Sequence, residues 1–172
     1  HGMHEVDASQ TIFLDQHIAL NQWRGDHRIL PGGAYAFFYS ADDSLVARTR
    51  DALAAASGLT VIAPQNFEAL LNFPQRGSRI PNLVAVADAP RYIGFKRGKG
   101  RKPPQGAHGY LPQNTPSMMG VFYASGPRIP AQTRLDAMEN VHIYPLVLDL
   151  LNIENESAID GDASVLVPHL SD

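Results

Sequence analysis

The sequence predicts an α/β fold, and three observations support this prediction. Short segments rich in apolar and aromatic residues alternate with segments of helical periodicity, most clearly between residues 33 and 88. The 172 residues are 44% hydrophobic and 18% charged, a composition typical of one globular domain large enough to bury a core. No apolar run approaches the roughly 20 residues of a membrane-spanning helix, and the start lacks the basic-then-apolar order of a signal peptide.

The first predicted elements are two strands. Residues 11–20, "TIFLDQHIAL", carry apolar residues at mixed spacing, so only the first half is predicted to be a strand. Residues 33–40, "GAYAFFYS", are short, rich in aromatic residues and bounded by glycine and serine. This pattern predicts a buried strand.

Residues 40–58 predict a helix that packs one face on a sheet. Ser40 is the expected N-cap, Asp42 and Asp43 lie at the positive end of the helix dipole, and Gly58 supplies the C-terminal stop. The arginines face water on the side opposite the apolar stripe, which consists of Leu45, Val46, Thr49, Leu53 and Ala56.

Three more elements complete a small α+β unit. Residues 59–64 and 82–88 predict strands, and residues 66–73 predict a short helix between them. The order from residue 33 to residue 88 is strand, helix, strand, short helix, strand. Such a unit can form a small sheet with a helix on one face.

Two further elements are expected nearer the carboxyl end. Residues 118–126, "MMGVFYASG", are typical of a central strand. Residues 140–153 predict a helix with one apolar face. This helix is expected to begin between Val141 and Ile143, because Pro145 is tolerated only in a first turn.

Charge and cysteine content narrow the classes of function. A net charge of -3 gives no global reason to expect nucleic-acid binding. The absence of cysteine excludes disulfides, thiolate metal sites and a cysteine nucleophile, so any metal must use His, Asp or Glu. Locally, residues 96–102, "KRGKGRK", form a basic segment with two open interpretations. It is either a solvated connection or an electropositive rim that concentrates an anionic substrate.

The chain begins with His1 and not with Met, and two interpretations of this start stay open. His1 is either the end of a purification tag or part of a natural chain that has been cut. Five other histidines show no metal-ligand spacing and are expected to be structural. They are His4, His17, His27, His142 and His169.

Four segments, in order, carry a resemblance to a known family: "HGMHEV", "SRIPNLVAVAD", "GAHGYLPQNTPSMMGVFYASGPRI" and "MENVHIYPLVLDLLNI". Together they resemble the carboxy-terminal part of the nucleotide pyrophosphatase/phosphodiesterase family, within the alkaline phosphatase superfamily. The resemblance extends from His1 to about Leu170. It implies an alkaline phosphatase-like sheet with helices, to which the small α+β unit is added as a sub-domain. Leu111 stands where the family often has Asp, which leaves the subfamily open.

The resemblance implies a two-zinc site to which this chain contributes two ligands. In the family, an Asp-His-Gly-Met motif supplies Asp and His to one zinc, and its histidine corresponds to His1. The histidine of the family's His-Gly-Tyr motif binds the other zinc and corresponds to His108. Two neighbouring zinc ions can stabilise both the attacking and the leaving oxygens of a phosphoryl transfer. We therefore expect His1 and His108 to lie at the same edge of one sheet.

The activity implied for the intact protein is hydrolysis of phosphodiester or pyrophosphate bonds, of nucleotides in particular, through a covalent phospho-Thr or phospho-Ser intermediate. The family's nucleophile and remaining ligands lie amino-terminal to this chain. We therefore expect no catalytic residue here, an inactive chain when it is alone, and weak zinc binding, while the substrate-binding residues stay unidentified. The alternatives are a non-catalytic capping or binding module and a phosphomonoesterase of the same superfamily.

The resemblance also implies the organisation of the chain and its surroundings. Residues 1–172 are expected to be the carboxy-terminal part of one phosphodiesterase domain, made of an inserted α+β unit (33–95), a basic flexible loop (96–105) and a return to the main sheet with a closing helix (106–172). The expected partners are a small phosphodiester or nucleotide substrate and the missing amino-terminal part, with neither nucleic acid nor a membrane span. A periplasmic or secreted location is expected.

Overall fold

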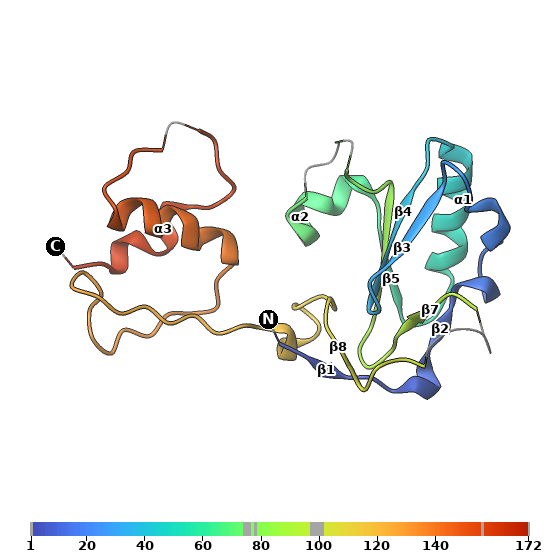
Figure 1. Cartoon of the computed structure of the whole chain (residues 1–172), viewed down its shortest axis with the longest axis horizontal. Helices are drawn as coiled ribbons and strands as arrows, with labels where there is room; N and C mark the ends of the chain where they lie inside the picture. The colour runs from blue at the N-terminus through green and yellow to red at the C-terminus, as the bar shows by residue number, and fades with distance from the viewer. Residues whose placement is uncertain (1, 74–76, 78, 97–101, 156, 172) are drawn as a thin grey trace. The chain divides into compact units, whose positions relative to one another are not determined.

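The computed structural model describes residues 2–73, 77, 79–96, 102–155 and 157–171. The chain divides into two compact units, His1–Val121 and Phe122–Asp172. The first unit contains all the described strands, and the second contains the helix α3 (Figure 1). The mixed α/β class predicted from the sequence is confirmed.

The centre of the first unit is a four-stranded antiparallel sheet with the order β3-β4-β6-β5. Its strands are β3 (Arg28–Pro31), β4 (Tyr35–Tyr39), β5 (Leu59–Ile62) and β6 (Leu83–Ala87). All five residues of β6 are buried, because this strand has neighbours on both sides and is covered on both faces. The three strands predicted within residues 33–88 are confirmed, and β3 is an additional edge strand.

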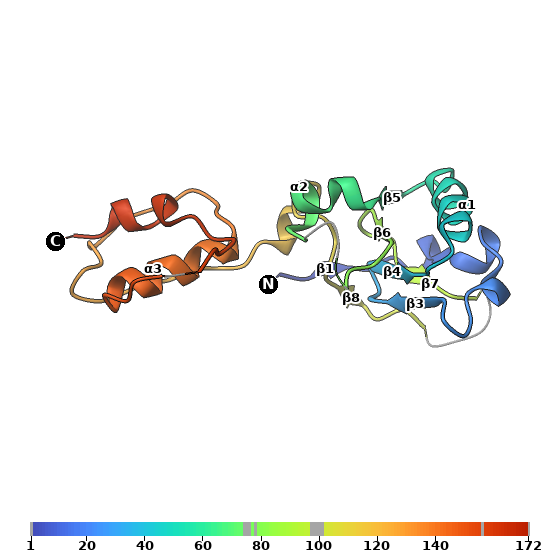
Figure 2. The same ribbon diagram turned by 90° about the horizontal axis from the view of Figure 1, so that it is seen from above.

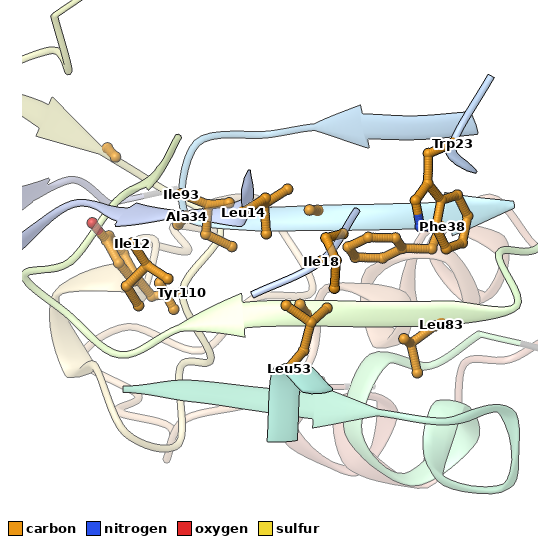
Figure 3. Close-up of a cluster of buried hydrophobic side chains, with 14 of the residues drawn as sticks. Ile12, Leu14, Ile18, Trp23, Ala34, Phe38, Leu53, Leu83, Ile93 and Tyr110 are labelled. Carbon is orange, nitrogen blue, oxygen red and sulfur yellow. The ribbon is translucent and has the colours of Figure 1, made fainter. Parts of the chain in front are cut away.

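Two helices cover opposite faces of this sheet, α1 (Asp43–Ala54) and α2 (Phe67–Leu71) (Figure 1). The faces follow from the alternation of side chains along a strand. On the α1 side, Ala36 and Phe38 of β4 belong to the larger buried cluster, whereas Val84 of β6 packs on the α2 side. The larger cluster is drawn in Figure 3, where Ile12, Leu14, Ile18, Trp23, Ala34, Phe38, Leu53, Leu83, Ile93 and Tyr110 are labelled.

The N-cap of helix α1 lies two residues after the predicted one. The carboxylate of Asp42 accepts a hydrogen bond from the Leu45 amide at 3.0 Å and is the N-cap. The prediction of Ser40 as the cap is wrong, because its hydroxyl accepts a hydrogen bond from the Asp42 amide and bonds the His27 ring. Ser40 therefore shapes the turn that leads into the helix.

Two short ladders tie the start of the chain to later segments. β2 (Ile12–Phe13) pairs in parallel with β7 (Ile93–Gly94). β1 (His4–Glu5) pairs antiparallel with β8 (Gly106–Ala107), and both views show these two strands side by side (Figure 1, Figure 2). The second ladder brings the chain start to the segment that precedes His108.

The second unit is built around α3 (Ile143–Leu150). Pro145 is the third residue of this helix and lies in the first turn, as predicted. The Arg128 guanidinium lies 3.0 Å from the Asp149 carboxylate and ties the segment before the helix to its last turn. None of the helices within the described ranges has the length and hydropathy that crossing a lipid bilayer requires.

The strand predicted at residues 118–126 is not present. The 3-10 helix Pro116–Met118 begins this segment, and the residues after it form neither helix nor strand. Val121 and Tyr123 are 90% and 93% exposed. Their β-branched and aromatic character is typical of strands, but none of the described strands pairs with this segment. The prediction failed because strand formation depends on a neighbour as well as on composition.

Candidate functional site

The candidate site is the segment "GAHGY", residues 106–110, called the "GAHGY" loop, which consists of β8 (Gly106–Ala107) and the three residues after it. His108 is the first residue after β8, and its side chain is exposed. Gly109 follows with a backbone φ of +91°, a conformation that L side chains rarely adopt. A Cβ on Gly109 would lie 2.5 Å from the Tyr35 ring, so glycine allows the loop backbone to pass close to the sheet.

Tyr110 anchors the carboxyl side of this loop in the core. Its side chain is 3% exposed and belongs to the larger buried cluster (Figure 3). The Tyr110 hydroxyl donates a hydrogen bond to the Arg91 carbonyl at 2.8 Å. Burial, and then the nearby Tyr92, raise the pKa of Tyr110, which keeps the hydroxyl protonated as a donor. His108 therefore lies between two fixed points, the strand β8 and the buried tyrosine.

The start of the chain packs directly against the segment that follows this loop. The Gly2 amide donates a hydrogen bond to the Met118 carbonyl at 3.2 Å. A Cβ on Gly2 would collide with the backbone carbonyl of Ser117, so the two backbones are in contact. Glycine in "HGM" is thus required by packing at this place.

His1 lies outside the described residues, so its side chain is not placed. The residues immediately after it are placed, because β1 pairs with β8 and His4 lies opposite Ala107. The two motifs that carry the predicted ligands are therefore adjacent along one ladder. The expectation that His1 and His108 share one sheet edge stays a prediction, and so does the role of the basic segment, because residues 97–101 are outside the described ranges as well.

Three of the histidines expected to be structural have hydrogen bonds. The Nδ1 atom of His27 lies 2.8 Å from the Ser40 hydroxyl. The Nδ1 atom of His142 accepts a hydrogen bond from the Asp162 amide at 2.9 Å. The Nδ1 atom of His4 lies 2.7 Å from the Ser117 hydroxyl.

Of these three histidines, only His4 contacts the "GAHGY" loop. Its ring meets the Tyr110 ring edge-on, with centroids 5.9 Å apart and an interplanar angle of 70°. Ligand spacing in the sequence gave no sign of this position, because its partners are about a hundred residues away in the chain. Only a pairing of β1 with β8 could have revealed it.

A metal would need more ligands than the described part of this chain brings together. Within those residues, no group of three or more His, Asp or Glu side chains is placed to hold a metal ion. An open depression of about 520 Å³ lies along β1 and is lined by His4, Glu5, Val6, Asp7, Ala8 and Pro90. The Asp7 carboxylate there already accepts hydrogen bonds from Ser9 and Gln10, and these bonds lower its pKa. Asp7 thus serves as the cap of a short 3-10 helix.

Comparison with solved structures shows which known proteins share the fold of this chain. Neither a protein-family model nor a curated protein matches the sequence. Human ectonucleotide pyrophosphatase/phosphodiesterase 5 (ENPP5) is similar over 100% of this chain, with a TM-score of 0.78 and 25% sequence identity. The chain has the fold of part of a nucleotide pyrophosphatase/phosphodiesterase. It spans 44% of the length of the human ENPP5 chain.

Murine ENPP5 shows the same likeness in two structures. Each match covers 99% of this chain and 43% of the murine chain, with a TM-score of 0.77 and 24% sequence identity. One of them is an inactive form in complex with AMP. The resemblance inferred from the four sequence segments, to the carboxy-terminal part of this family, is thereby confirmed.

Proposed function

We propose that this chain forms part of a two-zinc hydrolase that cleaves phosphodiester or pyrophosphate bonds of nucleotides. His108 is assigned as a ligand of one zinc and His1 as a ligand of the other. The observation that carries the proposal is the likeness to human ENPP5 over the whole chain. The AMP bound to murine ENPP5 supports a nucleotide as the substrate class.

The residues present fit a zinc site in part. A neutral imidazole is a good zinc ligand, and His108 is exposed on a loop whose backbone is fixed on both sides. Catalytic zinc needs about three protein ligands for each ion. The described residues offer no group of three His, Asp or Glu side chains placed for a metal ion. The proposal therefore assigns the remaining ligands, and the Thr or Ser nucleophile of the family, to parts of the protein outside this chain.

Zinc in this position would stabilise negative charge on the oxygens of the reacting phosphate. The residues of this chain hold the ligand in place. Tyr110 fixes the loop to the core, and Gly109 allows the close approach of the loop to Tyr35. The relatives are named ectonucleotide enzymes, which supports a periplasmic or secreted location for the intact protein.

The test compares the 172-residue chain with a longer form that restores the coding sequence upstream of His1. Both are assayed against an aryl phosphodiester with added zinc. We expect turnover only by the longer form. In that form, His1→Ala and His108→Ala should each lower the activity by at least about 100-fold, because loss of a residue that only supports a metal ligand already costs about 10- to 100-fold in activity or metal affinity. His169→Ala, at an exposed position of the second unit, is the matched control and should keep full activity.

Two results would overturn the proposal. One is full activity and full zinc content in the longer form of His108→Ala. The other is turnover by the 172-residue chain alone that His108→Ala abolishes, since the whole active site would then lie in this chain.

A further inference from the structure

We propose that His4 is a positioning residue that fixes the loop carrying His108 against the start of the chain. The inference rests on the proposed function for the role of His108 and extends it to a side chain that is not itself assigned as a zinc ligand. It follows from three sets of contacts that converge on residues 2–4.

The backbone contacts join the start of the chain to both ends of the segment from Ala107 to Met118, which contains His108. His4 lies opposite Ala107 in the β1–β8 ladder, immediately before His108. The Gly2 amide donates to the Met118 carbonyl, ten residues after His108 along the chain. The segment between Ala107 and Met118 is therefore closed at both ends on a stretch of three residues.

The side chain of His4 adds two contacts inside this closure. Its Nδ1 atom lies 2.7 Å from the Ser117 hydroxyl, a short hydrogen bond across 113 positions of sequence. Its ring and the Tyr110 ring form an edge-to-face pair with centroids 5.9 Å apart, a favourable aromatic geometry. His4 thus contacts residues on both sides of His108: Ala107 before it, and Tyr110 and Ser117 after it.

The consequence is that His4 restricts the backbone positions open to His108. Tyr110 is held from its other side by the hydrogen bond to Arg91, so the ring that His4 touches is itself fixed. A ligand on a fixed loop loses less conformational freedom when it binds a metal than a ligand on a loose loop. Loss of His4 should therefore loosen the loop and weaken zinc binding without removing a ligand.

The first experiment measures the loop without zinc, in the 172-residue chain. Amide hydrogen exchange is followed at Gly2, Thr115 and Met118, whose amides donate hydrogen bonds at the loop. His4→Phe keeps an aromatic ring and loses the hydrogen bond, Ser117→Ala removes the partner, and His4→Asn restores a polar atom near the place of Nδ1. His17→Phe, at an exposed histidine next to another turn, is the matched control.

We expect His4→Phe and Ser117→Ala each to accelerate exchange at these amides by about 2- to 10-fold, the range that one net hydrogen bond supports. The double variant should exchange no faster than either single variant, because both remove the same bond. His4→Asn should recover much of the protection, and His17→Phe should leave it unchanged. Amides of β6 report whether each variant is folded, since this strand is fully buried.

The second experiment measures zinc affinity of the longer form by competition with a chelator. We expect His4→Phe to weaken affinity by about 2- to 10-fold, with recovery in His4→Asn. A role limited to global stability would lower the unfolding midpoint and leave the zinc affinity of the folded protein unchanged.

The outcomes separate the two proposals. If the amides of His4→Phe or Ser117→Ala exchange at the wild-type rate, the role of His4 is overturned, regardless of the zinc affinity. Wild-type zinc affinity in His4→Phe also overturns it if His108→Ala loses zinc. If the exchange results hold but His108→Ala keeps its zinc, the proposed function falls and the fixation of the loop by His4 stands.

Discussion

Replacing Gly109 by alanine should destabilise the protein far more than the same change at Gly25. Both glycines have a positive φ, +91° at Gly109 and +66° at Gly25. A Cβ on Gly109 would lie 2.5 and 2.6 Å from two atoms of the Tyr35 ring, whereas a Cβ on Gly25 would meet no heavy atom within 4 Å. The pair therefore separates backbone strain, which both variants share, from a steric collision, which only one has.

The expected losses of stability follow from the cost of the backbone strain and the cost of the steric collision. A left-handed conformation costs alanine about 1 to 2 kcal/mol relative to glycine. The lower entropy of the unfolded alanine chain offsets about 0.4 to 1 kcal/mol of this cost, so Gly25→Ala should cost about 0 to 1.6 kcal/mol. At Gly109 the collision adds about 1 to 3 kcal/mol, typical of overpacking. The Tyr35 ring cannot move away freely, because it packs on the Phe37 ring with centroids 4.9 Å apart. Gly109→Ala should therefore cost about 1 to 3 kcal/mol more than Gly25→Ala, or about 1 to 5 kcal/mol in total.

Urea unfolding at neutral pH measures both free energies of unfolding. Tyr35→Ala supplies the internal check, because removing the ring should recover most of the collision term in the double variant Tyr35→Ala/Gly109→Ala. Equal losses in Gly25→Ala and Gly109→Ala, or additive losses in the double variant, would refute the reasoning.

Three other substitutions test the fold. Leu53→Ala, at a fully buried position of α1, should lower the free energy of unfolding in urea titrations by about 2 to 5 kcal/mol. Leu30→Ala, at a 49% exposed position, is the control and should cost less than about 1 kcal/mol. Similar losses in the two variants would contradict the assignment of Leu53 to the core. Tyr110→Phe should cost about 1 kcal/mol in the same assay, because the Arg91 carbonyl loses its donor, and an unchanged midpoint would show that this bond contributes nothing. Hydrogen bonds from the Ser44 hydroxyl, and then from the Leu45 amide, hold the pKa of Asp42 in the folded protein below its usual 3.8. The ionised Asp42 carboxylate therefore stabilises the fold. This stabilisation is complete above about pH 4 and is lost as the pH falls through the lower pKa of the folded state. Asp42→Ala should lower the melting temperature at pH 7 and flatten its dependence on pH below about 4; an unaltered pH profile would count against this cap.

Local sequence patterns were sufficient for the elements of the central sheet that carry their own signal. The alternation along β4 and the apolar run of β6 are recognisable without knowledge of their neighbours. The edge strand β3 was not predicted, because three of its four residues are exposed and it ends in Pro31, so it lacks the pattern of a buried strand. The cap of α1 was misplaced because Ser40 and Asp42 are both good caps, and only the contact of Ser40 with His27 decides between them.

The geometry of the candidate site was beyond local patterns. β1 and β8 are two-residue strands whose pairing joins positions about a hundred residues apart, and no periodicity exists in so short a segment. The motifs identified His108 through resemblance, whereas nothing in the spacing of the histidines distinguished His4 from His17. The difference between these two histidines lies in their neighbours, since only His4 meets Ser117 and Tyr110.

The residues of the "GAHGY" loop differ from one another in what the structure requires of each side chain. Gly106 leaves room for Met3, whose side chain would lie 3.0 Å from an added Cβ. Ala107 is 7% exposed in the ladder with His4, and the roles of Gly109 and Tyr110 are backbone conformation and burial. Each of these four residue types is accounted for by packing. His108 is exposed, so burial does not determine its type, and the four neighbours hold its backbone in place. If His108 is the zinc ligand proposed above, His108→Ala should leave the fold intact and weaken zinc binding in the longer form, and unchanged zinc affinity would contradict this role.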